Sequence, residues 1–439
     1  MASCFQCLLL VNFLILSAAG ATELVATQST PVPQESQVFE LSRSKYADQL
    51  EGFWLGACIA NWTGLVTEMD KIGDTPKYKT GPFYTRHDWG QPDQPSIWSE
   101  QPSDLSPTID FVLRGEDQVW GADDDTDIEY MYQHLLANQK TTRLSPQQIR
   151  QGWLKHIRSE EENYLWVSNE RAFRLMEEGV FPPLTSDPQQ NFEFEMIDAQ
   201  LTTEIFGFFA PARPDVAVKL AKLPIQTTAR QDAAWISEFY VRMYSLASLY
   251  DPHTSLQKHL MWSAEQASAS LPAGSYSRAM YEYVKKLHES GVTWEAARDA
   301  IHQRYQVEHA DGYDMSQKIG NGCFAAGINF AASLVSLFYG EGDFKKTIQI
   351  GTLAGWDSDN PTATWGGLLG FIYGRKKIES MFPEPLSDRY EIHRTRQNFP
   401  QGIDDFASMA RAGLEIVDRV VVEEMDGKID QQRWLIPIQ

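Results

Sequence analysis

The spacing of hydrophobic residues along most of the chain is that of amphipathic helices. Apolar side chains recur at intervals of three and four residues at Ile128, Met131, Tyr132, Leu135 and Leu136. Further stretches with helical spacing cover 145–179, 195–208, 214–222, 231–249, 255–268, 277–289, 293–306, 322–339, 343–353 and 403–424. The sequence contains no succession of short alternating strands. The pattern therefore predicts an all-α fold in a single domain, a helical bundle.

Two long stretches lack this periodicity. Residues 22–43 are polar and contain proline, so we expect an extended segment that leads into a helical domain at 44–439. Residues 77–120 are rich in Pro, Gln, Asp and aromatic residues, which predicts a long irregular loop. A loop of this length inside a compact protein is usually functional or disordered. Its aromatic residues favour a functional loop only slightly, because aromatic side chains also anchor loops by burial.

Small residues recur every four positions in two segments. They are Gly52, Gly56, Ala60 and Gly64 in the first, and Gly366, Gly370 and Gly374 in the second. Each glycine inside a helix costs about 1 kcal/mol relative to alanine, so several in register need a structural reason. A stripe of small residues lets a second backbone approach closely. We therefore expect both segments to form tightly packed helices.

The composition is that of a large, acidic, folded protein. The chain has 439 residues, of which 43% are hydrophobic, with 13 Trp, 22 Phe and 17 Tyr, and this is enough for a large core. Its formal charge is −21, and it has no basic run long enough to bind a phosphate backbone. We therefore expect no nucleic-acid partner.

The N-terminal segment predicts export. Residues 1–21 contain an apolar stretch from Leu8 to about Leu16 and then Ala19-Gly20-Ala21, which is typical of a signal peptide, although its start carries no Lys or Arg. This stretch is too short to span a bilayer, and no later segment reaches ~20 uninterrupted apolar residues. The mature protein is predicted to be secreted, without a membrane partner after cleavage.

Signal cleavage would leave Cys58 and Cys323 as the remaining cysteines. Both lie in apolar, glycine-rich helical patterns, which favours buried thiols over a disulfide but leaves their pairing open. They provide too few thiolates for a zinc site.

The first candidate site is the acidic run in GADDDTDIEYMYQ, at 121–133. Its four carboxylates are Asp123, Asp124, Asp125 and Asp127. One interpretation is a solvated helix start, because Thr126 and Glu129 have capping-box spacing and acidic groups favour the first turn of a helix. The other is a metal site, because carboxylates this close repel one another unless a hard cation lies among their oxygens.

A second acidic group precedes the other glycine-rich segment, in GWDSDNPTATWGG. Asp357 and Asp359 are two positions apart, and on a helix they would point about 200° from each other, so we place them in a turn. Asn360 suits an N-cap and Pro361 the first position of a helix. Alone, this pattern is a common loop-and-cap sequence.

The two acidic groups predict a metal centre only in combination. Each lies where a turn leads into a helix, and the second helix has the stripe expected of close packing. If the two helix starts meet, at least four carboxylates share one small region. Such a cluster needs roughly two divalent cations, and oxygen ligands favour Mg²⁺ or Mn²⁺. No spacing of His or Cys residues indicates zinc.

Three segments, in order, carry a family resemblance. They are LEGFWLGACIANWTGLVTE, ADDDTDIEYM and YGEGDFKKTIQIGTLAGWDSDNPTATWGGLLGFIYG. Together they resemble the ADP-ribosylglycohydrolases, the group that includes dinitrogenase reductase-activating glycohydrolases and crystallin J1. The resemblance is clearest over 46–374 and unclear beyond. It implies an all-α bundle with a binuclear Mg²⁺ or Mn²⁺ centre in a cleft.

The resemblance implies metal ligands at the first acidic turn. The usual motif of the family there is Thr-Asp-Asp-Thr, whose last three positions match Asp124, Asp125 and Thr126. Asp123 stands at the first position in place of a hydroxyl residue, and we count it among the implied ligands.

The second turn matches the motif Asp-x-Asp followed by Thr or Ser. Asp357 and Asp359 match its aspartates, and Asn360 stands where a hydroxyl ligand is expected. An Asn carbonyl can still coordinate such a cation, so Asn360 is included as an implied ligand. The departures at Asp123 and Asn360 imply altered metal occupancy or selectivity and weaken transfer of the usual substrate.

Glu68 ends the first segment, where some members of the family place a glutamate near the scissile bond. A solvated carboxylate at a helix end is the alternative. The implied hypothesis is that the cations hold a ribose-like diol and a water, that Asp124 or Asp125 accepts a proton, and that Glu68 acts as acid, base or substrate positioner. The bond broken would be N- or O-glycosidic.

Further polar residues lie in matching stretches. Asn321 and Gly322, in KIGNGC, and His309, before them, are candidates for substrate binding, on a loop that could face a ligand. Gln200 and Glu204 are assigned mainly to packing and interhelical hydrogen bonds.

The sequence thus predicts a secreted, metal-dependent hydrolase for a small-molecule or protein-linked ribosyl substrate, such as an ADP-ribosyl conjugate. Export leaves open a different extracellular glycoside or nucleoside. A third alternative is a non-catalytic binding or structural protein, to which the changes at Asp123 and Asn360 give some weight. The retained aspartates count against it, because clustered carboxylates are costly without a cation.

Overall fold

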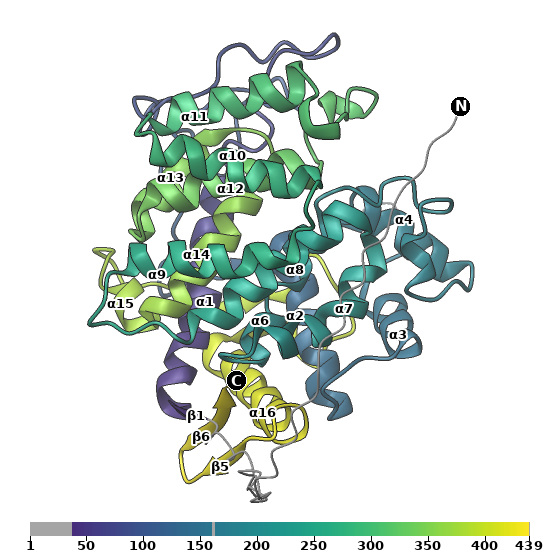
Figure 1. Cartoon of the computed structure of the whole chain (residues 1–439), viewed down its shortest axis with the longest axis vertical. Helices are drawn as coiled ribbons and strands as arrows, with labels where there is room; N and C mark the ends of the chain where they lie inside the picture. Colours follow the sequence, from purple (N-terminus) through teal and green to yellow (C-terminus); the bar gives the residue numbers. More distant parts are fainter. Residues whose placement is uncertain (1–36, 160–162, 439) are drawn as a thin grey trace, which may run out of the picture. The chain divides into compact units, whose positions relative to one another are not determined.

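Helices dominate the computed structural model, which describes residues 37–159 and 163–438 (Figure 1). They are α1 (Arg43–Gly64), α2 (Asp124–Gln139), α3 (Pro146–His156), α4 (Val167–Glu177), α5 (Asp198–Thr203), α6 (Phe206–Phe209), α7 (Pro214–Thr228), α8 (Gln231–Ala247), α9 (Leu256–Ala267), α10 (Tyr276–Glu289), α11 (Trp294–Ile301), α12 (Ala326–Gly340), α13 (Phe344–Ala354), α14 (Asp359–Tyr373), α15 (Arg375–Glu379) and α16 (Phe406–Glu423). The all-α prediction is confirmed. Among these helices, none has the length and hydrophobicity that crossing a bilayer requires. The predicted signal peptide at 1–21 lies outside the described residues.

Most helical windows match single helices, but some are divided. The window at 145–179 becomes α3 and α4, and the window at 195–208 becomes the short helices α5 and α6. The window at 293–306 contains α11 and a π-helical turn at His302–Val307. Hydrophobic spacing does not mark such breaks, because the connecting segments also bury apolar residues such as Ile157 and Leu165.

Short strands also occur in the described residues, and the sequence pattern did not reveal them. β1 (Gln37–Ser42) pairs antiparallel with β6 (Arg433–Ile438), which pairs with β5 (Lys428–Asp430). β1 therefore occupies the end of the segment that was expected to be an extended lead-in, and α1 begins at Arg43. Its partner lies almost 400 residues away, which no local pattern can show.

A second small sheet supports the first acidic turn. β2 (Trp120–Gly121) runs parallel to β3 (Arg389–Glu391), and β3 pairs antiparallel with β4 (Ile403–Asp405). The Ala122 N–H, just after β2, donates to the Glu391 carbonyl at 3.1 Å. This pairing brings the residues that follow β3 beside the acidic residues that follow β2.

The two glycine stripes face each other, with α1 and α14 side by side (Figure 1). A Cβ atom added to Gly56 would overlap the carbonyl oxygen of Gly366, and one added to Gly370 would overlap that of Gly52. The expected close helix packing is therefore confirmed. At the end of the stripe, a Cβ atom on Gly64 would overlap the Cα atom of Asp359, so the end of α1 lies against the start of α14.

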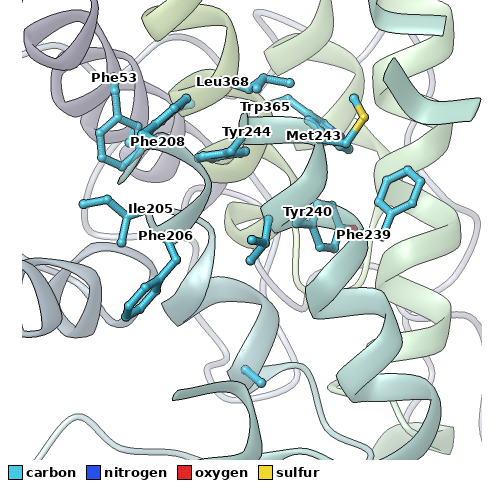
Figure 2. Packing of buried hydrophobic residues seen from close by; sticks show 14 of the residues in the cluster. Phe53, Ile205, Phe206, Phe208, Phe239, Tyr240, Met243, Tyr244, Trp365 and Leu368 are labelled. Atoms are coloured by element: carbon cyan, nitrogen blue, oxygen red, sulfur yellow. The ribbon is translucent and has the colours of Figure 1, made fainter. Parts of the chain in front are cut away.

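Aromatic side chains fill the core beside this helix pair. Figure 2 shows Phe53 of α1, Phe208 and Tyr244 packed together, and the ring of Phe208 also stacks on Phe371 of α14 at 4.0 Å between centroids. The Tyr244 hydroxyl donates to the Thr364 carbonyl at 2.7 Å, so its buried polar group has a partner. These contacts hold α14 between α1 and α8.

Cys58 and Cys323 are buried, free thiols. The structure therefore resolves the pairing that the sequence left open, in favour of two separate cysteines.

Candidate metal centre and active site

The two acidic turns meet. Carboxylate oxygens of Asp123, Asp124, Asp125 and Asp359 lie within 4.8 Å of one another, and so do those of Glu68, Asp357 and Asp359. Because Asp359 belongs to both groups, they are adjacent. The convergence expected from the sequence is present, and we call the six residues of these two groups the acidic centre.

The first turn caps α2 differently from the prediction. Asp123 is the N-cap, its N–H donates to Thr126 Oγ1 at 3.2 Å, and its carbonyl accepts from the Thr126 N–H at 3.0 Å. The cap therefore lies one turn before the predicted Thr126–Glu129 pair. Glu129 is instead buried and accepts a hydrogen bond from the Ile205 N–H at 2.7 Å.

The second turn begins α14 earlier than expected. Ser358 is the N-cap and Asp359 the first helical residue, so Asn360 lies inside the helix and not at its cap. The Ser358 hydroxyl donates to the Gly64 carbonyl at 2.9 Å, and Thr67 Oγ1 lies 3.0 Å from Ser358 Oγ. These bonds attach the turn to the end of α1, next to Glu68.

Asn360 joins the two turns. Its Nδ2 donates to Asp125 Oδ1 at 2.9 Å, while its Oδ1 accepts from Gln200 Nε2 at 2.8 Å. The reverse amide orientation would place two oxygens against each other, so these contacts fix it. Asn360 therefore positions Asp125, and its carbonyl is already engaged, so its predicted role as a cation ligand gains no support. Gln200 makes the interhelical bond that was expected.

Two further side chains hold the first turn. Asn61 Nδ2, from α1, lies 3.3 Å from Asp123 Oδ2 and 3.4 Å from Asp125 Oδ2. Arg394 Nη1 donates to Asp123 Oδ1 at 2.9 Å. Sequence reasoning missed both. Asn61 offered a signal, as a polar residue beside the small-residue stripe, whereas Arg394 follows β3, beyond the resemblance.

Asp127 has a different role from its neighbours. It forms a fully buried ion pair with Arg396 at 3.0 Å and accepts from the Thr395 hydroxyl at 2.6 Å. The Tyr390 hydroxyl lies 2.9 Å from Thr126 Oγ1. The segment 390–396 thus secures the acidic turn along its length.

Carboxyl groups of the acidic centre are buried and raise one another's pKa. Burial raises the pKa of Asp124, Asp125 and Asp359 well above the usual range, and neighbouring carboxylates raise it further. Burial also raises the pKa of Glu68 well above its usual range, and the charge of Asp357 is the second cause. Burial raises the pKa of Asp357 to about 7. A bound cation would reverse these shifts.

One buried oxygen of the acidic centre has no hydrogen-bond partner. Asp359 Oδ1 is buried without a hydrogen-bond partner, although Asp359 belongs to both carboxylate groups. Buried polar atoms are seldom left unpaired. An unpaired carboxylate oxygen among other carboxylates fits a hard divalent cation, for which oxygen atoms are the preferred ligands.

Aromatic residues surround the opening of the acidic centre. The cavity that exposes Glu68, Asp124 and Asp357 is also lined by Trp98, Trp166 and Phe324. The same three aromatic residues line a neighbouring, mainly apolar cavity of about 440 Å³. The Trp98 ring stacks on Phe324 at 5.9 Å, and the two Trp residues are each 57% exposed. The long loop at 77–120 thus contributes Trp98 to the wall of the site.

The predicted substrate-binding residues are only partly brought together. Gly322 lines the apolar cavity. Asn321 Nδ2 donates to the Gln306 carbonyl at 2.8 Å, and Gln306 Oε1 accepts from Trp356 Nε1 at 2.8 Å, so Asn321 supports the turn before Asp357. His309 Nδ1 lies 3.5 Å from Asp314 Oδ1, and His309 lines neither cavity. Its role in binding stays a prediction.

Comparisons with known proteins show the family and the fold. The family model for ADP-ribosylglycohydrolase matches residues 42–412. Among solved structures, a chain described as an ADP-ribosylglycohydrolase-related protein complex is similar, with a TM-score of 0.50 and 15% identity over 85% of this chain and 98% of that chain. This likeness concerns the fold. A comparison with curated proteins finds no match. The family match spans both acidic turns and Glu68, and the chain belongs to the ADP-ribosylglycohydrolase family.

Proposed function

We propose that this protein is a metal-dependent hydrolase that cleaves the N- or O-glycosidic bond of an ADP-ribosyl or related ribosyl conjugate. One observation carries the proposal: two carboxylate groups share Asp359 at the meeting point of the turns that precede α2 and α14. Membership of a glycohydrolase family agrees with hydrolysis as the reaction type.

The residues of the acidic centre would bind two cations between them. Asp123, Asp124, Asp125 and Asp359 would hold one divalent cation, and Asp357 and Asp359 would hold a second beside Glu68. Two Mg²⁺ or Mn²⁺ ions supply Lewis acidity and a template for sugar hydroxyls and water. Asn61 and Asn360 would hold the carboxylate of Asp125 in place, and Arg394 would hold that of Asp123.

Two carboxyl groups are suited to proton transfer. Asp124 lines the open cavity, whereas Asp125 is held by Asn61 and Asn360, so Asp124 is the better base for an attacking water. Glu68 lines the same cavity, so its carboxyl group could exchange a proton with the leaving group or position the substrate.

The apolar cavity bears on the substrate class. Trp98, Trp166 and Phe324 line both this cavity and the one at the acidic centre, so a sugar held there could place an attached flat group among them. Adenine in an ADP-ribosyl conjugate is such a group. The base of a nucleoside or an aryl aglycone is the second candidate, supported by the same cavity. The signal peptide expected at 1–21 would place the reaction outside the cell.

A substrate panel tests the proposal. ADP-ribosyl-arginine, ADP-ribosyl-serine, nucleosides and aryl glycosides would be incubated with the mature protein and Mg²⁺ or Mn²⁺. Hydrolysis is expected to disappear in Asp357→Ala and Asp359→Ala and after chelation, but to persist in Asp430→Ala, whose side chain pairs with Arg433 on the small β1-β6-β5 sheet. Full activity of Asp359→Ala in chelator would rule out the metal mechanism. Tight cation binding without turnover on any substrate would favour a binding protein.

A further inference from the structure

Among the described residues, one positively charged side chain pairs with the acidic centre. Within residues 37–159 and 163–438, Arg394 is the only cationic side chain that forms an ion pair with any of its six carboxylates. The partner is Asp123, at 2.9 Å from Nη1. The other five carboxylates face one another without such a partner.

Arg394 is held in place by several contacts. Its Nη1 also donates to the Ala122 carbonyl at 2.5 Å, and its guanidinium carbon lies 5.5 Å from the ring centroid of Trp62. The Trp62 ring is itself fixed, because Nε1 donates to the Gly121 carbonyl at 3.0 Å. The pairing of β2 with β3 brings this segment to the turn. A guanidinium fixed in this way has little orientational freedom left to lose.

We propose that Arg394 is a positioning residue which fixes Asp123 and offsets its charge, and thereby sets how tightly the first acidic group binds a divalent cation. A cation bound at the first acidic group would then lie beside an Asp123–Arg394 pair with almost no net charge. The inference rests on the cation binding of the proposed function but not on hydrolysis, since cation affinity is its readout.

Coulomb's law gives the direction of each change. Removing the guanidinium leaves Asp123 as an uncompensated carboxylate and strengthens attraction for a cation. Removing the Asp123 charge leaves a guanidinium beside the site and weakens that attraction. Removing both charges restores a neutral pair. A purely structural role makes another prediction, because either single change would then loosen the turn and weaken binding.

Calorimetric titration of Mn²⁺ into the mature protein and three variants decides between these cases. We expect Arg394→Met to lower the Kd on the order of tenfold, Asp123→Asn to raise it by a similar factor, and the double variant to lie within about threefold of the unaltered protein. Weaker binding in both single variants, with no recovery in the double variant, would overturn the proposal. Absence of Mn²⁺ binding by the unaltered protein would overturn both the proposal and the metal-dependent function.

Two control variants separate charge from packing. Arg394→Lys keeps the charge and should bind within about threefold of the unaltered protein. Arg114→Met removes a guanidinium that lies 4.4 Å from the centroid of the same Trp62 ring but pairs with no carboxylate of the acidic centre, so its Kd should stay nearly constant. If Arg394→Met fails to fold, the double variant must still bind more tightly than Asp123→Asn, and equal or weaker binding would refute the proposal.

Discussion

The Nδ2 atom of Asn360 lies 2.9 Å from Asp125 Oδ1 and bridges two acidic turns that are 235 positions apart in the sequence. The bridging group is a neutral amide, so it stabilises the Asp125 carboxylate without adding charge to the acidic centre. Gln200 holds the amide from its other side. The two turns therefore meet through a hydrogen bond as well as through the packing of α1 against α14.

Asn360→Asp should separate the turns when no cation is present. The new carboxylate would face Asp125 inside the protein, and repulsion would replace a hydrogen bond at a cost of about 1–3 kcal/mol. We expect a lower Tm in chelator and a larger rise of Tm on adding Mn²⁺ than in the unaltered protein. Thermal unfolding measured under both conditions checks this.

Asn360→Ala is the control for that experiment, because it removes the bond without adding charge. It should lose less stability in chelator and show a smaller response to Mn²⁺ than Asn360→Asp. Equal behaviour of the two variants would show that charge at position 360 does not matter.

Gly56→Ala should damage the site from a distance. The added Cβ atom would overlap the Gly366 carbonyl oxygen, and neither backbone can yield without moving α14, whose first residue is Asp359. Overpacking of this kind typically costs about 1–3 kcal/mol. Denaturant unfolding should show that loss, together with weaker Mn²⁺ binding. Gly115→Ala, where the nearest atom to an added Cβ lies at 3.9 Å, should change neither quantity.

Local patterns predicted much of the fold and the site. The stripes that begin at Gly52 and Gly366 identified the central helix pair, since close helix packing leaves a repeat of four residues. The carboxylates of the acidic turns could also be predicted from the sequence, because each group lies within a few consecutive residues just before a helix.

Long-range pairing left no comparable signal. β2 has two residues, and the residues of β3 that pair with it lie 270 positions later, so neither strand shows a periodicity that could reveal Arg394 as a neighbour of Asp123. The start of α14 was misplaced for a related reason. Asn360 has good capping propensity, but bonds to Asp125 and Gln200 decide its orientation, and Pro361 is still tolerated in the first turn.

Trp98→Ala and Trp166→Ala should reveal whether the apolar cavity binds part of the substrate. Each Trp lines both this cavity and the cavity at the acidic centre, so its removal should raise KM on the order of tenfold for a substrate with an aromatic group, with a smaller effect on kcat. Steady-state kinetics on one hydrolysed substrate measures both constants. Phe192→Ala is a matched control, because this aromatic side chain is 70% exposed and lines neither cavity. An unchanged KM in both Trp variants would assign the cavity no part in binding.

Glu129 and Glu204 form a buried carboxyl pair behind the first acidic turn. Glu129 accepts from the Ile205 N–H at 2.7 Å, and Glu204 accepts from the Thr364 hydroxyl. Burial raises the pKa of both well above the ordinary value of 4.5, and Glu204 raises that of Glu129 further. Asp125 also faces Glu204 and adds to the shift. The folded protein therefore retains protons on this pair that the unfolded chain releases.

The sign of the pH dependence follows from that difference. A folded-state pKa above the unfolded value means that the folded state binds more protons, so the free energy of unfolding falls as pH rises above about 4.5 toward the folded pKa. Glu204→Gln removes one of these protons and relieves the repulsion on Glu129. In chelator, its free energy of unfolding should fall less between pH 5 and 8 than that of the unaltered protein, by up to about 1.4 kcal/mol per pH unit. Guanidinium unfolding across this range measures the slope, and an identical slope in Glu204→Gln would show that the pair does not hold the extra proton.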